Sequence, residues 1–159
     1  MQPKKLKYMN TPIQRILLID DDSDDAFLMK KALADAAPTV EMDHVEDCDE
    51  IFDSLNKSIP DLIFLDINMR KRNGLECLAD IKDHSKYKRI SVIMYSSSDY
   101  PAHVTQAYGY GANLYLKKPS SYPAMVLSLR SILSLDWSRP ESITSNQFRK
   151  DQFQPFTCT

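Results

Sequence analysis

Side chains that can bind a cation or a phosphoryl group follow several apolar runs of this sequence, each where the run ends. Asp20 and Asp21 follow the first run, Asp66 closes another, and Ser96 and Lys118 follow two later ones. Carboxylates brought together repel one another and need a counter-charge, which a hard divalent cation such as Mg²⁺ supplies. If the fold brings these side chains together, they suit phosphoryl transfer.

In that chemistry Asp66 is the candidate nucleophile, because a carboxylate oxygen can take a phosphoryl group to form an aspartyl phosphate. Asp20 and Asp21 would hold the cation, and Lys118 and Ser96 would bind the phosphoryl oxygens. A lone Asp at the end of a strand is more often a turn residue. The assignment therefore depends on which elements position the other side chains.

The apolar runs alternate with helical patterns along the chain, which predicts one parallel sheet covered by helices on both faces. Right-handed crossovers then favour an α/β fold of the flavodoxin-like doubly wound (βα)5 type, with five strands in the order 2-1-3-4-5. In that order the first, third, fourth and fifth strands lie side by side, so their carboxyl ends converge. We expect strands near 16–19, 39–45, 61–66, 90–95 and 113–116, and helices near 26–37, 51–55, 75–81, 101–108 and 122–136.

Length and composition indicate one ordinary globular domain, because the chain has 159 residues, of which 43% are hydrophobic and 26% charged. We expect a flexible N-terminal arm over 1–12, the domain over 13–137 and a C-terminal tail over 138–159. The tail loses the apolar periodicity, although its phenylalanines could dock on the domain.

Charge and apolar patterning also limit the class of partner. The net charge of -2 counts against a nucleic-acid partner. No apolar run is long enough to span a membrane, and no signal-type segment follows the Lys-rich start, so we expect a cytoplasmic protein with no membrane partner. Cys48, Cys77 and Cys158 are widely spaced without a Cys-x-x-Cys pair, so we expect a reducing compartment and neither a disulfide framework nor a structural zinc site.

Over about 13–137, the sequence resembles the receiver domains of two-component response regulators. The matching pieces are the acidic pair Asp20 and Asp21, the Leu-Asp pair that ends at Asp66, the hydroxyl of Ser96 and the Lys-Pro pair that starts at Lys118. The run from Ile16 to Ala26, with its stretch Asp-Asp-Asp-Ser-Asp-Asp, is similar to that of small stand-alone receivers that partner phytochrome-like or hybrid kinases.

The resemblance implies that Asp66 accepts a phosphoryl group from a histidine kinase or a phosphotransfer protein. It implies a bound Mg²⁺, held by Asp21, Asp66 and the backbone carbonyl of Asn68, with Asp20 acting largely through water. A receiver catalyses its own phosphorylation and dephosphorylation only, so we expect a signalling protein rather than an enzyme with a separate substrate.

The resemblance further implies that Ser96 and an aromatic residue of the fifth strand, Tyr115, move together when the Asp is phosphorylated. The output would be a changed surface formed by the fourth helix, fifth strand and fifth helix, which an unknown downstream protein reads. Receivers of this kind often pair through that face, so a homodimer is also possible.

One departure from the family pattern is Arg70, which stands where a Pro is usual and begins a basic stretch with Lys71 and Arg72. A solvated loop is the favoured interpretation. The alternative is a patch that guides an acidic partner or alters the lifetime of the phosphoryl group.

Two other functions stay open. One is a receiver-shaped interaction module that is never phosphorylated. The other is a phosphohydrolase of the haloacid dehalogenase type, which would need a second Asp two positions after the nucleophile, where Asn68 stands. A transcription factor is disfavoured, because the segment after 137 is too short for a helix-turn-helix domain and carries few basic residues.

Overall fold

A five-stranded parallel sheet forms the centre of the protein, whose computed structural model describes residues 12–158. The strand order β2-β1-β3-β4-β5 confirms the predicted doubly wound topology. All but the last residue of the expected N-terminal arm lies outside the described residues. The strands are β1 (Arg15–Ile19), β2 (Glu41–Val45), β3 (Leu62–Asp66), β4 (Ser91–Ser96) and β5 (Leu114–Lys117).

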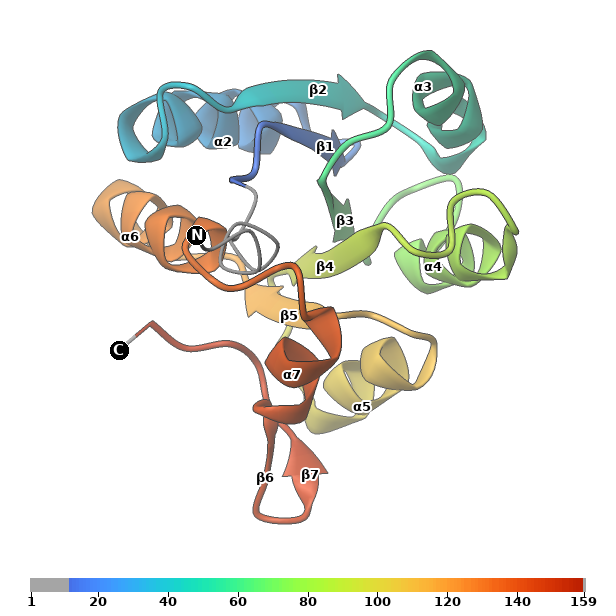
Figure 1. The fold of residues 1–159 in the computed structure, drawn as a ribbon, viewed down its shortest axis with the longest axis vertical. Helices are drawn as coiled ribbons and strands as arrows, with labels where there is room; N and C mark the ends of the chain where they lie inside the picture. The colour runs from blue at the N-terminus through green and yellow to red at the C-terminus, as the bar shows by residue number, and fades with distance from the viewer. Residues whose placement is uncertain (1–11, 159) are drawn as a thin grey trace, which may run out of the picture.

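Helices cover both faces of this sheet, with α2 and α6 on one face and α3, α4 and α5 on the other (Figure 1). A short 3₁₀ helix, η1 (Cys48–Glu50), leads into α3. No helix within residues 12–158 is both long and apolar enough to cross a membrane. The covering helices are α2 (Ser23–Ala36), α3 (Ile51–Lys57), α4 (Gly74–Asp83), α5 (Pro101–Gly109) and α6 (Tyr122–Leu133).

The strand β3 is buried on both faces, which explains its continuous apolar run. Leu62 and Phe64 pack in the core beneath α2 and α6, whereas Ile63 and Leu65 pack in the core beneath α3, α4 and α5. Side chains alternate between the faces of a strand, so the next residue, Asp66, points toward the same side as Phe64. The strand therefore carries its terminal carboxylate toward the side covered by α2.

The acidic run after β1 becomes the start of α2. Asp22 is the N-cap, and its carboxylate accepts the backbone N–H groups of Asp24 and Asp25 at 2.9 and 3.3 Å. Acidic side chains in the first turn favour the helix because they face its positive end. The sequence pattern predicted that the helix begins near Ala26, after these acids. It begins instead at Ser23, so Asp24 and Asp25 lie inside its first turn.

The C-terminal tail has more structure than its sequence predicted. After α6 the chain forms the short helix α7 (Pro140–Ser145) and a hairpin of β6 (Phe148–Arg149) and β7 (Gln152–Phe153). These elements lie against α5 and the edge strand β5 (Figure 1). The tail was predicted only as a polar segment with aromatic residues, because its helix and strands are too short to show periodicity.

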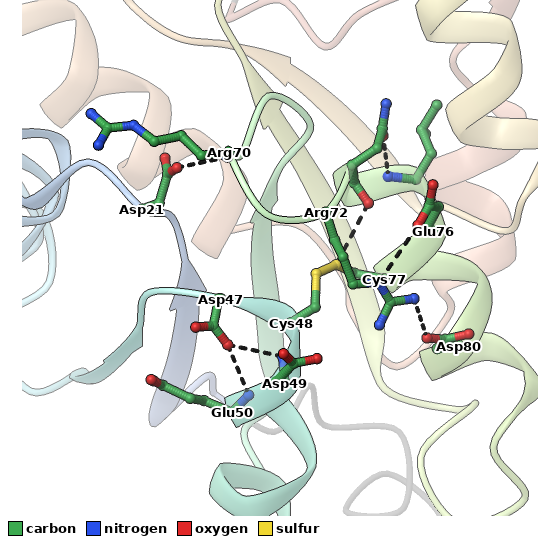
Figure 2. Close-up of a disulfide and its surroundings, with 12 residues drawn as sticks. Asp21, Asp47, Cys48, Asp49, Glu50, Arg70, Arg72, Glu76, Cys77 and Asp80 are labelled. Carbon is green, nitrogen blue, oxygen red and sulfur yellow. Dashed lines mark hydrogen bonds and ion pairs between the residues drawn. A yellow bond between two sulfur atoms is a disulfide. The ribbon is translucent and has the colours of Figure 1, made fainter.

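The spacing of the cysteines counted against a disulfide framework, but the structure corrects this, because Cys48 and Cys77 form a disulfide (Figure 2). They are 29 residues apart in sequence, but η1 and α4 pack on the same face of the sheet and bring their Cα atoms to 5.8 Å, a separation that a disulfide spans. Sequence spacing did not show this proximity, because it depends on how two elements pack. Cys158 is free.

Candidate functional site

Three carboxylates meet at the carboxyl ends of β1 and β3. Oxygen atoms of Asp20, Asp21 and Asp66 all lie within 4.8 Å of one another. Asp20 is fully buried and Asp66 is 4% exposed, so little water screens the repulsion between them. The donors are all carboxylate oxygens, which suits a hard divalent cation such as Mg²⁺.

Backbone amides hold these carboxylates in place. The N–H of Asn68 donates to Asp66 Oδ1 at 3.1 Å, and the N–H of Asp22 donates to Asp20 Oδ1 at 2.9 Å. The N–H of Arg70 donates to Asp21 Oδ2 at 2.9 Å, which ties the loop after β3 to the loop after β1 (Figure 2). These bonds give each carboxylate a fixed direction, and because an ionised carboxylate has about four lone-pair sites, each can still accept a further contact from a cation.

Lys118, which follows β5, brings a positive charge into this cluster. Its Nζ lies 3.1 Å from Asp20 Oδ2, 3.2 Å from Asp66 Oδ2 and 2.7 Å from Asp25 Oδ2. Burial opposes the charge of the ammonium, but the bond with Asp25 and the charges of Asp66 and Asp20 outweigh it and raise the pKa of Lys118. The lysine therefore remains charged.

Despite this lysine, the surroundings of Asp66 still disfavour the ionised form of its carboxyl group. Burial raises its pKa to about 6, and the charge of Asp20 adds to the rise, although Lys118 opposes it. One ammonium does not compensate for the carboxylates gathered here. A bound divalent cation would favour the ionised form of Asp66 and complete the charge balance.

Ser96 and Tyr115 lie together beside this cluster. Ser96 ends β4, is fully buried, and accepts the backbone N–H of Lys118 on its carbonyl at 2.7 Å. Its hydroxyl oxygen accepts the N–H of Ser98 at 3.2 Å, and the Tyr115 hydroxyl donates to the carbonyl of Ser98 at 2.6 Å. Burial is the largest effect on the Tyr115 hydroxyl and raises its pKa above the ordinary value, although the nearby Ser96 side chain acts to lower it. The two predicted switch residues thus both form hydrogen bonds with Ser98, in the loop after β4.

The basic loop after β3 is largely paired within the chain. Lys71 Nζ lies 3.1 Å from Asp47 Oδ2, and the guanidinium of Arg72 lies 2.6 Å from Asp80 Oδ2 (Figure 2 shows Arg72). Arg70 is exposed. Since two of the three charges have partners on this chain, the arrangement fits a solvated loop better than a patch that recruits an acidic protein.

Sequence reasoning missed two side chains of the site, Asp25 and Tyr95. Asp25 makes the shortest contact with Lys118, and the ring centroid of Tyr95 lies 5.1 Å from the same Nζ. Tyr95 pairs with Asp66 across the β3–β4 ladder. Asp25 was taken as a helix-start acid and Tyr95 as part of an apolar strand, because no local pattern shows that both face the lysine.

The chain is similar in sequence to known signalling proteins. The family model described as the response regulator receiver domain matches residues 16–130. The response regulator Rcp1 of Synechocystis is 30% identical, over 69% of this chain and 79% of that protein.

Two solved structures of response regulators are also similar. The phosphorylated cyanobacterial phytochrome response regulator RcpA is 30% identical, with a TM-score of 0.71 over 79% of this chain and 95% of that one. The Mn²⁺-bound form of Rcp1 is 28% identical, with a TM-score of 0.68 over 77% of this chain and 93% of that one. Both are response regulators, and the second holds a divalent cation.

Proposed function

The chain belongs to the response regulator receiver family and functions in two-component phosphorelay signalling, and we propose that it does so by accepting a phosphoryl group on Asp66. The observation that carries the proposal is the position of this carboxylate. Asp66 belongs to the acidic cluster with Asp20 and Asp21, and Lys118 Nζ lies 3.2 Å from its Oδ2. A nucleophile that has both a candidate cation site and a lysine within reach suits an incoming phosphoryl group.

In this reaction one carboxylate oxygen of Asp66 attacks the phosphorus atom of a phosphorylated histidine. The O–P bond forms as the P–N bond breaks, and the histidine keeps the bonding electron pair and takes up a proton. Lys118 Nζ, 3.2 Å from Asp66 Oδ2, pairs with a phosphoryl oxygen on that carboxylate, and the Ser96 hydroxyl binds another.

The cation we propose is Mg²⁺, held by Asp20, Asp21, Asp66 and the backbone carbonyl of Asn68. When bound, it supplies positive charge to the transferring phosphoryl oxygens. The oxygen-only donor set supports this choice. The Mn²⁺-bound form of Rcp1 supports a divalent site in a similar receiver.

Receivers interact with histidine kinases and with downstream partners, and we propose that this receiver signals through α5, β5 and α6. Tyr115 on β5 links that surface to Ser96, because both contact the loop after β4. A phosphoryl group that draws the Ser96 hydroxyl toward Asp66 would alter the bonds of Tyr115 and thus the surface around it. Because the C-terminal tail lies against α5 and β5, we include it in this surface, through which we also propose that two copies pair.

The experiment that tests phosphorylation is incubation with phosphoramidate and Mg²⁺, followed by intact-mass measurement. Wild type should gain one phosphoryl group and Asp66→Asn none. Asp53→Asn, which changes an exposed aspartate on α3, is the matched control and should be labelled like wild type. Equal labelling of wild type and Asp66→Asn would contradict the proposal.

The two alternatives give different results in the same experiment. An unphosphorylated interaction module would leave wild type unlabelled, with partner binding unchanged in Asp66→Ala. A phosphohydrolase would release phosphate over many turnovers rather than stop at one phosphoryl group per chain.

A further inference from the structure

Lys118 contacts a carboxylate that lies outside the acidic cluster. Its Nζ is 2.7 Å from Asp25 Oδ2, closer than to Asp20 or Asp66. The cluster whose oxygens could hold a cation contains Asp20, Asp21 and Asp66 but not Asp25. Asp25 therefore interacts with the lysine without belonging to the candidate metal site.

The three contacts use the full donor capacity of the lysine. An ammonium carries three N–H donors and no acceptor, and Lys118 has acceptors on Asp20, Asp25 and Asp66. With two donors held by Asp20 and Asp25, the third is directed at Asp66. A phosphoryl group on Asp66 would take this third donor while the other two stay bound.

Asp25 and the Tyr95 ring, which contact the Lys118 ammonium from different sides, are each held in position. Its backbone N–H is bound by the N-cap carboxylate of Asp22 at 3.3 Å, which holds the first turn of α2 in position. On another side of the lysine, the ring of Tyr95 lies 5.1 Å from Nζ, a cation–π distance. Tyr95 is 1% exposed and packs edge-on against Phe64, so the position of its ring is restricted.

We propose that Asp25 is a positioning residue, which together with the Tyr95 ring holds the Lys118 ammonium in line with Asp66 for phosphoryl transfer. The inference rests on the proposed function of Asp66. It gives α2 a role in the reaction in addition to its role in covering one face of the sheet. Loss of Asp25 should leave the cation site intact and allow the ammonium to turn away from Asp66.

The test compares Asp25→Ala with Asp24→Ala, which removes a neighbouring acid from the same helical turn. The side chain of Asp24 has no hydrogen bond or ion pair within residues 12–158. At saturating Mg²⁺, Asp25→Ala should lower the rate of phosphorylation by phosphoramidate about tenfold, because the lost bond joins two charged groups. Asp24→Ala should react like wild type, and calorimetry should give Mg²⁺ affinities within about twofold for all three proteins.

A conservative variant separates positioning from general damage to the helix. Asp25→Asn keeps an acceptor oxygen and should recover part of the rate. Rates of Asp25→Ala equal to those of Asp24→Ala would overturn the proposal. It would also be overturned if Asp25→Ala weakened Mg²⁺ binding in proportion to the rate, because Asp25 would then act on the cation.

A second measurement does not depend on phosphorylation. In protein with isotope-labelled lysine, the ammonium signal of Lys118, identified by its loss in Lys118→Arg, should be protected from exchange in wild type and Asp24→Ala and broadened in Asp25→Ala. If phosphoramidate labels neither wild type nor Asp24→Ala, the proposed function fails while this signal still reports on the position of Lys118. An unchanged signal in Asp25→Ala overturns the positioning role itself.

Discussion

The phenolic oxygen of Tyr108 accepts the backbone N–H of Tyr115 at 3.0 Å and donates to the carbonyl of Gln154 at 3.3 Å. The carbonyl of Tyr115 in turn accepts the N–H of Phe156 at 2.7 Å. Tyr115 lies on β5, the edge strand of the sheet, whose outward backbone groups would otherwise lack strand partners. A side chain of α5 and the C-terminal tail therefore complete the edge at the predicted switch residue.

This arrangement predicts that Tyr108→Phe destabilises the fold. The change leaves the buried N–H of Tyr115 without its acceptor, and an unsatisfied buried group costs about 1–3 kcal/mol. Urea unfolding should show this loss as a lower midpoint with an unchanged slope. Tyr110→Phe removes the hydroxyl of a neighbouring exposed tyrosine and should leave the midpoint unchanged. Equal midpoints for both variants would contradict the assignment.

The opposite result is expected at Tyr95. Its hydroxyl is buried and has no hydrogen-bond partner within residues 12–158. Tyr95→Phe removes this unsatisfied group and keeps the ring against Lys118, so the variant should gain about 1 kcal/mol of unfolding free energy. Phosphorylation should proceed at the wild-type rate, because the contact with Nζ is made by the ring. A clear loss of stability would mean that the hydroxyl has a partner in solution.

The core fold could be predicted from sequence because its strands are short apolar runs that end in polar residues. The strand order then placed the ends of β1, β3, β4 and β5 together, and with them Asp20, Asp66, Ser96 and Lys118. These residues were found because each follows a recognisable run.

The remaining features depend on contacts between elements that carry no local signal. The disulfide of Cys48 and Cys77 arises from the packing of η1 and α4, and the contact of Asp25 with Lys118 requires the first turn of α2 to lie beside the end of β5. The tail, with elements of two to six residues, is held by contacts with α5 and β5 rather than by its own periodicity.

The raised pKa of Asp66 predicts a pH dependence of stability in the metal-free protein. Between the ordinary value of 3.8 and about 6, the folded state binds more protons than the unfolded state. Stability therefore falls as pH rises through this window, by about 2 kcal/mol once solvent screening is allowed for. In chelator, Asp66→Asn should lack this fall and become more stable than wild type above pH 6.

Mg²⁺ provides the control for that measurement. A bound cation favours the ionised carboxylate, so saturating Mg²⁺ should reduce or reverse the advantage of Asp66→Asn at neutral pH. A stability difference between the two proteins that does not change with pH would show that burial of the Asp66 charge is not its cause.

The disulfide predicts a stability that depends on the redox state. A bond between Cys48 and Cys77, 29 residues apart, should stabilise the fold by about 3–4 kcal/mol, mainly by restricting the unfolded chain. Urea unfolding with and without a thiol reductant should show this difference in wild type and lose it in Cys48→Ser. Cys158→Ser, which changes the free cysteine, should retain it. Thiol labelling of the unfolded chain that finds every cysteine free without reductant would contradict the bond.

Gly74, the first residue of α4, lies directly against the backbone of Asp66. A Cβ at this position would lie 2.0 Å from the backbone carbonyl oxygen of Asp66 and 2.8 Å from the Cα of Ile67. The N–H of Gly74 also donates to the carbonyl of Ile67 at 2.8 Å, so the loop after β3 closes on the start of α4. Because the contacts are with backbone atoms, no rotamer change can relieve them.

We therefore expect Gly74→Ala to destabilise the fold by about 3 kcal/mol and to slow phosphorylation of Asp66, because the strand end must move to admit the methyl group. The control is Gly109→Ala, where nothing lies within 4 Å of the added Cβ. That variant should keep or slightly raise stability, since Ala favours the helix, and should be phosphorylated like wild type. If Gly74→Ala behaved like Gly109→Ala in both measurements, α4 would not constrain the acceptor. If it lost only stability, α4 would support the fold without positioning the carboxylate of Asp66.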